Sequence, residues 1–165
     1  AFPGLGGDVP AEMIREFLDI YEQELGQHAQ LFAGVAELLD AIEAVGSRWG
    51  IVTNKPEYLA RKILPALGWA SRSAILIGGD TLAQRKPHPL PLLHAAQVLG
   101  VAIDECVYVG DDQRDIDAAR AAGMRSVVAL WGYRPEGDDP AAWGGDVMAA
   151  SARDLLTPAL WEALR

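Results

Sequence analysis

Residues 106–115 read Cys-Val-Tyr-Val-Gly-Asp-Asp-Gln-Arg-Asp, an apolar run that ends at a glycine and is followed by three carboxylates. A short β-rich run of this kind, from Cys106 to Val109, is typical of a buried strand. The small-residue stretch from Gln113 to Ala122, which stops before Gly123, predicts a helix directly after it. The carboxylates therefore stand at the junction between a predicted strand and a predicted helix.

The same alternation of apolar runs and helical patterns continues on both sides of this segment. Short strands that are apolar throughout and separated by helices are typical of a parallel sheet covered on both faces. The sequence therefore predicts an α/β fold, in which a long loop from Trp131 to Gly145 precedes a last helix from Ser151. The other expected strands are Trp49–Thr53, Ala74–Ile77 and Val127–Leu130, and the other expected helices are Val9–Gly26, Val35–Val45, Pro56 to about Leu67 and Pro89–Leu99.

Length and composition bound what the chain can be. Its 165 residues (17.7 kDa) suit one domain, and a hydrophobic share of 50% is enough to build a core. A net charge of −9 opposes nonspecific binding to nucleic acid or anionic lipid, and no apolar stretch approaches the ~20 residues that cross a bilayer. A single cysteine, Cys106, permits no internal disulfide. We therefore expect a cytoplasmic monomer or homodimer that binds neither nucleic acid nor membranes.

Polar side chains gather where three successive predicted strands end. Thr53 and Asn54 close the first, Lys86 follows the second, and Asp111 and Asp115 follow the third. Because ligands of parallel sheets bind at the carboxyl ends of the strands, we expect these side chains to converge. Hydroxyl, amide and ammonium groups suit phosphoryl oxygens, and the carboxylates suit Mg²⁺ between them and the anion. Metal-assisted phosphoryl transfer is the predicted chemistry.

Each of these residues also has a purely structural interpretation. Thr53 and Asn54 would then cap the helix that follows them, and Lys86, before Pro87, would be a solvated loop residue. The ordered set at three strand ends favours the functional interpretation over these alternatives. For the carboxylates the alternatives are a helix cap at Asp112 and pairing of Asp111 and Asp115 with Arg114 or Arg120.

The order of these motifs carries a family resemblance. A strand ending in Thr53-Asn54, then Gly78-Gly79-Asp80, Lys86-Pro87-His88-Pro89 and Gly110-Asp111-Asp112-x-x-Asp115, resembles the haloacid dehalogenase superfamily of phosphatases, in particular its phosphoglycolate phosphatase-like group, over roughly residues 31–157. The resemblance implies a Rossmann-like three-layer α/β/α fold with a helical cap. It also implies an Mg²⁺-dependent phosphomonoester hydrolase that acts through a phosphoaspartate intermediate on a small phosphorylated metabolite.

The resemblance assigns a role to each matched residue. Thr53 and Asn54 correspond to phosphoryl-binding positions, and Thr53 and Lys86 to positions that serve catalysis. Lys86 would also bind the phosphoryl group and neutralise its charge. Asp111 and Asp115 correspond to the metal ligands.

One motif of the family does not occur in this sequence. The family's nucleophile and general acid belong to an Asp-x-Asp-Gly-Thr motif on its first strand, which lies between the strands that here end at Thr53 and Asp111. We therefore expect residues 1–30 to be the remnant of a truncated cap, and residues 31–165 to be a core domain without its first strand. The natural protein would then carry further residues upstream. The alternatives are a genuine fragment and a non-catalytic protein of the same fold that binds phosphate or acts as a scaffold.

The loop after the fourth strand suggests a substrate. Trp131-Gly132-Tyr133, Asp138-Asp139-Pro140 and Trp143-Gly144 resemble the N-acetylmuramic acid 6-phosphate phosphatases, which implies that substrate, with 2-phosphoglycolate as the alternative. The rings of Trp131, Tyr133 and Trp143 are of the kind that pack against sugar faces. The competing interpretation is a loop that only packs on the last helix.

Overall fold

The computed structural model of the chain describes Met13 and residues 30–134 and 137–164. The helix predicted from Val9 to Gly26, and with it the predicted cap remnant, falls almost entirely outside these residues. Within them, helices and strands alternate as predicted. In chain order the elements are α2 Val35–Ala44, β1 Ile51–Val52, α3 Glu57–Ile63, β2 Leu76–Ile77, α4 Leu90–Leu99, the 3₁₀ helix η1 Ile103–Glu105, β3 Val107–Gly110, α5 Gln113–Ala122, β4 Arg125–Ala129, the 3₁₀ helix η2 Pro140–Trp143, β5 Val147–Ala149, the 3₁₀ helix η3 Ala152–Leu156 and α6 Pro158–Ala163.

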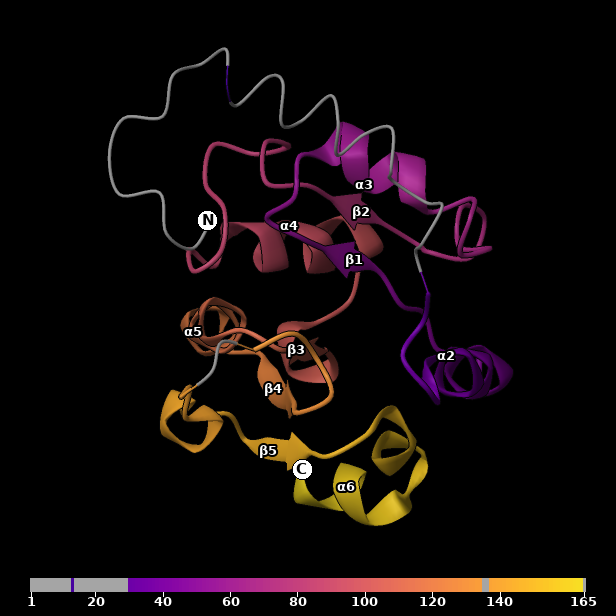
Figure 1. The fold of residues 1–165 in the computed structure, drawn as a ribbon, viewed down its shortest axis with the longest axis vertical. Coiled ribbons are helices and arrows are strands. Elements are labelled where there is room, and N and C mark those ends of the chain that lie inside the picture. Colours follow the sequence, from indigo (N-terminus) through magenta and orange to yellow (C-terminus); the bar gives the residue numbers. More distant parts are fainter. Residues whose placement is uncertain (1–12, 14–29, 135–136, 165) are drawn as a thin grey trace.

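The strands of the described residues form two parallel sheets (Figure 1). In one, β1 pairs with β2; in the other, β4 lies between β3 and β5. The backbone N–H groups of Ile51 and Thr53 donate to residues of the β2 segment, at 2.8 and 2.9 Å. The backbone groups of Val52 therefore face the other edge of β1, toward β3.

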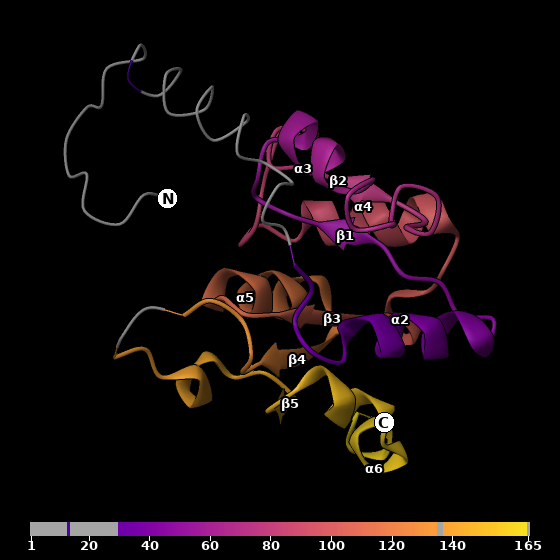
Figure 2. The same ribbon diagram turned by 45° about the vertical axis from the view of Figure 1, so that its right-hand side comes forward.

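Helices cover both faces of the β3–β4–β5 sheet (Figure 2). On one face, Leu38 of α2 packs in a cluster with Val127 of β4. On the opposite face, Ile116 of α5 packs against Val128, the next residue of β4, and Leu92 of α4 packs against α5. Because both valines are fully buried, each stabilises the fold by about 1.5–3 kcal/mol through the area it removes from water. This is the predicted α/β/α arrangement.

A network of ion pairs and hydrogen bonds joins α2 to the segments that precede β1 and β2. Arg72 lies within 2.6 Å of Asp40 and 3.0 Å of Glu43, both on α2. The indole N–H of Trp49 donates to the same Glu43 carboxylate at 2.7 Å, and the Trp49 ring contacts Trp69 edge-on. These contacts tie the β1–β2 sheet to the helix that packs on the other sheet.

The structure differs from the sequence expectation at the carboxyl-terminal end. The predicted loop Trp131–Gly145 contains the 3₁₀ helix η2, and it is followed by β5, a strand that the sequence pattern did not predict. The predicted last helix is divided at Thr157 into η3 and α6, because Pro158 begins a new helix. The strand β5 escaped prediction because Val147–Ala149 is only three residues long, too short to show a periodic pattern.

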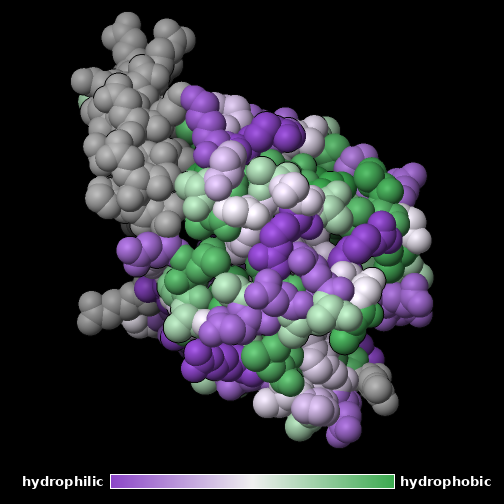
Figure 3. All heavy atoms as spheres, turned by 90° about the vertical axis from the view of Figure 1, so that its right-hand side faces the viewer, coloured by the Kyte–Doolittle hydropathy of each residue, from purple (hydrophilic) through white to green (hydrophobic). Residues whose placement is uncertain are grey.

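On the face shown in Figure 3, hydrophilic residues separate the hydrophobic patches, so no large continuous apolar surface is seen there. Among the described residues, no helix is long and apolar enough to cross a membrane.

Candidate active site

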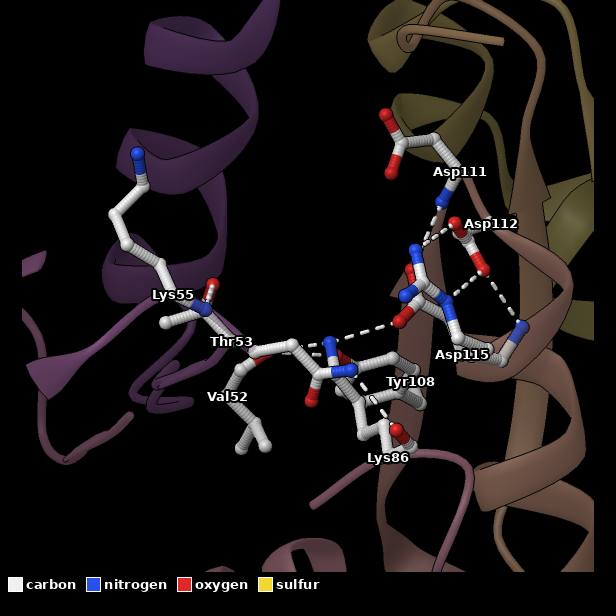
Figure 4. A network of polar contacts seen from close by, with 10 residues as sticks. Val52, Thr53, Lys55, Lys86, Tyr108, Asp111, Asp112 and Asp115 are labelled. Atoms are coloured by element: carbon white, nitrogen blue, oxygen red, sulfur yellow. Dashed lines mark hydrogen bonds and ion pairs between the residues drawn. The ribbon is translucent and has the colours of Figure 1, made fainter. Parts of the chain in front are cut away.

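The ammonium group of Lys86 lies at the centre of the contacts between the two sheets (Figure 4). Only 7% of this residue is exposed, and its Nζ lies 2.7 Å from Oδ1 of Asp115 on α5. The same Nζ donates to the Val52 carbonyl oxygen of β1 at 2.8 Å. The predicted meeting of Lys86 with Asp115 is therefore present, and the alternative of a solvated loop lysine is wrong.

Tyr108 belongs to this cluster although nothing in the sequence singled it out. Its hydroxyl accepts a hydrogen bond from Lys86 Nζ at 2.7 Å and donates one to the Val52 carbonyl at 2.8 Å. Burial raises the pKa of the Tyr108 hydroxyl well above its ordinary value, so the hydroxyl keeps its proton and remains a donor. The sequence could have indicated Tyr108, because it is a tyrosine inside an otherwise apolar strand. A buried tyrosine hydroxyl needs a polar partner.

Asp112 and Asp115 are placed by the amino end of α5. The Asp112 side chain accepts from the backbone N–H of Arg114 at 2.8 Å, which confirms the predicted helix cap. One turn on, Asp115 uses Oδ1 for Lys86 and Oδ2 for the backbone N–H of Asp111, at 3.2 Å. Burial raises the pKa of Asp115 above its ordinary value, while the charge of Lys86 works in the opposite direction.

Gly110 allows the third strand to end this close to α5. A Cβ built on Gly110 would lie only 2.3 Å from the Cβ of Asp115. Any larger residue would therefore push α5 away from the strand end and separate Asp115 from Lys86.

The carboxylate of Asp111 points away from the ion pair of Lys86 and Asp115 (Figure 4). Its Oδ2 accepts from the backbone N–H of Tyr133 at 2.9 Å, in the loop that follows β4. Among the described residues, that N–H group is the only hydrogen-bond partner of the Asp111 carboxylate. The predicted arginine alternatives are not observed, since Arg114 pairs with Asp112 and Arg120 with Asp117.

Thr53 and Asn54 close β1 as predicted, but neither caps the helix that follows. The Thr53 hydroxyl accepts from the backbone N–H of Lys55 at 3.1 Å, and the N-cap position of α3 is Pro56, which makes no side-chain cap hydrogen bond. Asn54 donates from Nδ2 to the backbone carbonyl of Lys86 at 2.8 Å and so fixes the loop that carries the lysine. Its Oδ1 is buried and has no donor among the described residues.

A close approach of backbone holds Asn54 in place. A Cβ on Gly79 would lie 2.2 Å from the Asn54 carbonyl oxygen, so only glycine fits between β2 and the end of β1. The neighbouring Asp80 accepts from the backbone N–H of Glu57 at 2.7 Å and so satisfies one donor at the start of α3. The Gly78-Gly79-Asp80 motif therefore packs the two strand ends together.

The donor set suits Mg²⁺, although the described residues contain no group of three His, Cys, Asp or Glu side chains able to hold a metal ion. Mg²⁺ is commonly bound through one or two carboxylates, with waters and substrate phosphate completing its shell. Asp111 offers such a carboxylate, whereas both oxygens of Asp115 already have partners. Among the described residues, Asp111 therefore keeps one carboxylate oxygen without a partner, whereas Asp115 contacts Lys86 and the backbone of Asp111 with its two oxygens. The metal-binding roles of Asp111 and Asp115 both stay predictions.

The aromatic residues of the loop after β4 divide into two kinds. Trp143 is only 4% exposed and packs in the core against Ile116 of α5, and not on the last helix as the competing interpretation expected. Trp131 is partly buried against the α2 face of the sheet. Tyr133 is 86% exposed, and its ring contacts that of Phe32 at 5.3 Å between centroids. Of these three rings, Tyr133 is the most exposed.

Comparison with known proteins agrees with this arrangement of strand ends. The sequence model of the haloacid dehalogenase-like hydrolases matches residues 6–129, which include β1, Lys86 and the carboxylates after β3. The chain belongs to the haloacid dehalogenase-like hydrolase family. The predicted family and the predicted α/β fold are thereby confirmed.

Relatives of this haloacid dehalogenase-like hydrolase carry phosphatase names. It is 60% identical over 161 residues to a phosphoglycolate phosphatase of Xanthomonas campestris, covering 98% of this chain and 73% of the relative. It is 41% identical over 155 residues to an N-acetylmuramic acid 6-phosphate phosphatase of Pseudomonas aeruginosa, covering 93% of this chain and 69% of the relative. Both names agree with the predicted enzyme class.

A solved structure of the same family shares the fold. The crystal structure of a predicted phosphoglycolate phosphatase from Haemophilus somnus superposes with a TM-score of 0.82 at 30% identity, covering 90% of this chain and 67% of that one. The chain therefore shares the overall fold of that structure over the part that the two have in common.

Proposed function

We propose that this protein is an Mg²⁺-dependent phosphomonoester hydrolase that acts on a small phosphorylated metabolite, with 2-phosphoglycolate as the first candidate. The observation that carries the proposal is the buried ammonium group of Lys86, paired at 2.7 Å with Asp115 where β1 and β3 end. A buried cation of this kind is costly unless it has anionic partners. A phosphoryl group would provide a second anionic partner in the reaction.

Each residue of the site has a defined task in this proposal. Lys86 neutralises charge on the phosphoryl oxygens, and Asp115 and Tyr108 hold its ammonium group in position. Asn54 fixes the backbone of Lys86, and the Thr53 hydroxyl donates to a phosphoryl oxygen while it accepts from Lys55. A bound Mg²⁺, held by Asp111, would supply further positive charge to the phosphoryl group.

The proposal includes a carboxylate nucleophile on a strand between β1 and β3, which forms a phosphoaspartate. Two observations support this position. The backbone groups of Val52 face the edge of β1 that β2 leaves unpaired, and Val109 of β3 is 38% exposed although its strand lies inside the molecule. A strand inserted there would complete one parallel sheet and cover Val109. Residues 31–165 would then be a core domain without its first strand.

The second candidate substrate is N-acetylmuramic acid 6-phosphate. The names of relatives at 41% and 44% identity favour it, as does the exposed ring of Tyr133 beside Asp111, since an amphipathic ring suits the face of a sugar. The 60% identity to phosphoglycolate phosphatases favours 2-phosphoglycolate more strongly.

A side-by-side measurement of kcat/KM for both substrates tests the proposal, using the full-length protein with Mg²⁺ and then with excess EDTA. We expect hydrolysis of 2-phosphoglycolate that EDTA abolishes. A preference of tenfold or more for N-acetylmuramic acid 6-phosphate, about 1.4 kcal/mol of differential transition-state binding, would replace the first candidate with the second. Phosphate binding without turnover of either would instead indicate a non-catalytic protein.

A further inference from the structure

The turn that follows β4 lies directly against the carboxylate of Asp111. The backbone N–H of Tyr133 donates to Asp111 Oδ2 at 2.9 Å. A Cβ built on Gly132 would lie 2.1 Å from the Asp111 Cβ and 2.2 Å from Oδ2. Contacts this short with a side chain mean that residue 132 must be glycine for the turn to reach the carboxylate.

Glycine is required at residue 132 because a side chain has no room there, and not because the backbone conformation requires it. Gly132 is not among the glycines with positive φ, so an alanine there would meet no backbone strain. The Tyr133 ring, in turn, is 86% exposed and contributes little to the core. The main contact of this turn with the site is therefore the hydrogen bond from the backbone N–H of Tyr133 to Asp111.

We propose that Gly132 and the backbone N–H of Tyr133 position Asp111 as a metal ligand, an inference that rests on the proposed Mg²⁺-dependent function. A hydrogen bond from a backbone N–H to a carboxylate oxygen fixes the rotamer of the side chain. With Oδ2 held by Tyr133, Oδ1 is the oxygen left for a cation. Groups that orient metal ligands in this way typically change metal affinity by about 10–100-fold when they are lost.

A pair of variants at Tyr133 isolates the effect of the backbone N–H group from the effect of the aromatic ring. Tyr133→Ala and Tyr133→Pro both delete the ring, but only proline deletes the N–H donor. Glycine at 132 tolerates a following proline better than other residues do. In the full-length protein without substrate, titration calorimetry with Mg²⁺ alone should give a Kd about tenfold higher for Tyr133→Pro than for Tyr133→Ala.

Gly132→Ala provides a second, independent variant, because its methyl group would displace the turn from Asp111 and leave the N–H in the chain. We expect the same loss of Mg²⁺ affinity in protein that circular dichroism shows to be folded without Mg²⁺. Equal Mg²⁺ affinity of Tyr133→Pro and Tyr133→Ala would overturn the inference. A folded Gly132→Ala variant that binds Mg²⁺ with wild-type affinity would also overturn the inference. This second result is sufficient if Tyr133→Pro does not fold.

Asp111→Ala separates this inference from the proposed function. If that variant binds Mg²⁺ as the wild type does, then Asp111 is not a ligand and the metal assignment itself is wrong. If Asp111→Ala loses Mg²⁺ and the turn variants do not, only the role of the turn is wrong.

Discussion

Lys86 and Asp115 form a buried ion pair whose two members depend on each other. Their side chains are 8% and 10% exposed, so each charge has lost most of its water. In such a pair the desolvation penalty consumes much of the attraction, and removing one partner leaves an uncompensated charge. The intact pair is therefore expected to add little net stability, whereas the loss of either partner alone is costly.

A double-variant cycle tests this dependence. Lys86→Met keeps the apolar stem but leaves Asp115 alone, so we expect the free energy of unfolding to fall by about 3 kcal/mol. Adding Asp115→Asn should restore most of that loss, because no buried charge remains. Urea denaturation measures both effects. Activity gives the contrast, since kcat should fall by orders of magnitude in the single and the double variant alike.

The exposed ring of Tyr133 separates the two candidate substrates. If the ring packs on the sugar, Tyr133→Ala should lower kcat/KM for N-acetylmuramic acid 6-phosphate about tenfold, the loss of ~1.4 kcal/mol. The value for 2-phosphoglycolate, which has no sugar face, should change less than threefold. Tyr133→Phe, which keeps the ring, is the matched control. An equal loss for both substrates would show that the ring has no part in the choice between them.

At the level of secondary-structure elements, Asp146, which directly precedes β5, binds to Ser126 of β4. Its Oδ2 accepts from the backbone N–H and the hydroxyl of Ser126, at 2.8 and 2.9 Å. Burial alone would raise the pKa of Asp146, but these hydrogen bonds and the charge of Arg125 together lower it below its ordinary value. Because the folded form prefers the ionised carboxyl, the stabilisation is complete above the unfolded pKa and is lost as the pH falls through the folded one.

We therefore expect Asp146→Asn, which retains an acceptor oxygen, to be less stable than the wild type at neutral pH. The difference in unfolding free energy should be largest above about pH 5 and should shrink as the pH falls toward ~2. Chemical denaturation at several pH values gives the difference directly. A difference that does not vary with pH would show that the carboxyl charge is unimportant to this contact.

The helices were more predictable than the strands. The bounds of α5 were predicted to the residue, because Asp112 and Gly123 mark its two ends. The strands β1 and β2 have two residues each, fewer than predicted, although backbone hydrogen bonds between the two segments extend from Trp49 and Ala74 to Thr53 and Ile77. The strand β5 was missed, because its pairing with β4 depends on the tertiary contact of Asp146 with Ser126 and leaves no periodicity in the sequence.

The site was predictable as a set of residues but not as a set of contacts. The strand-end rule brought Lys86 and Asp115 together correctly. It did not reveal Tyr108, which is an apolar-strand residue by pattern, or Gly132, whose role depends on a loop returning from β4 to Asp111. Contacts of this kind arise from the path of the backbone between elements.

At the scale of the whole molecule, two sheets are joined mainly by side chains. Lys86 and Tyr108 link β1 to β3 and α5, and Arg72 links α2 to the segment before β2. Backbone hydrogen bonds between β1 and β3 do not contribute in the described residues, since the two strands belong to different sheets. Unpaired strand edges of this kind favour association with other chains.

We therefore expect residues 1–165, expressed alone, to lack a sharp thermal transition and to hydrolyse neither substrate. Differential scanning calorimetry at several protein concentrations measures the transition and any association. The full-length protein is the control and should melt cooperatively. A single cooperative transition of the 165-residue chain would show that the proposed strand between β1 and β3 is not needed for folding.

The carbonyl oxygen of Val52 has both Lys86 and Tyr108 as donors. Any strand that pairs with β1 requires this oxygen for a backbone N–H of its own, so at least one of the two donors must leave. If Lys86 is the donor that leaves, its ammonium group keeps Asp115 and Tyr108 as partners and gains a free N–H for a phosphoryl oxygen. The contacts that hold the ammonium group of Lys86 would therefore differ between a chain with an open β1 edge and a chain whose sheet is closed there.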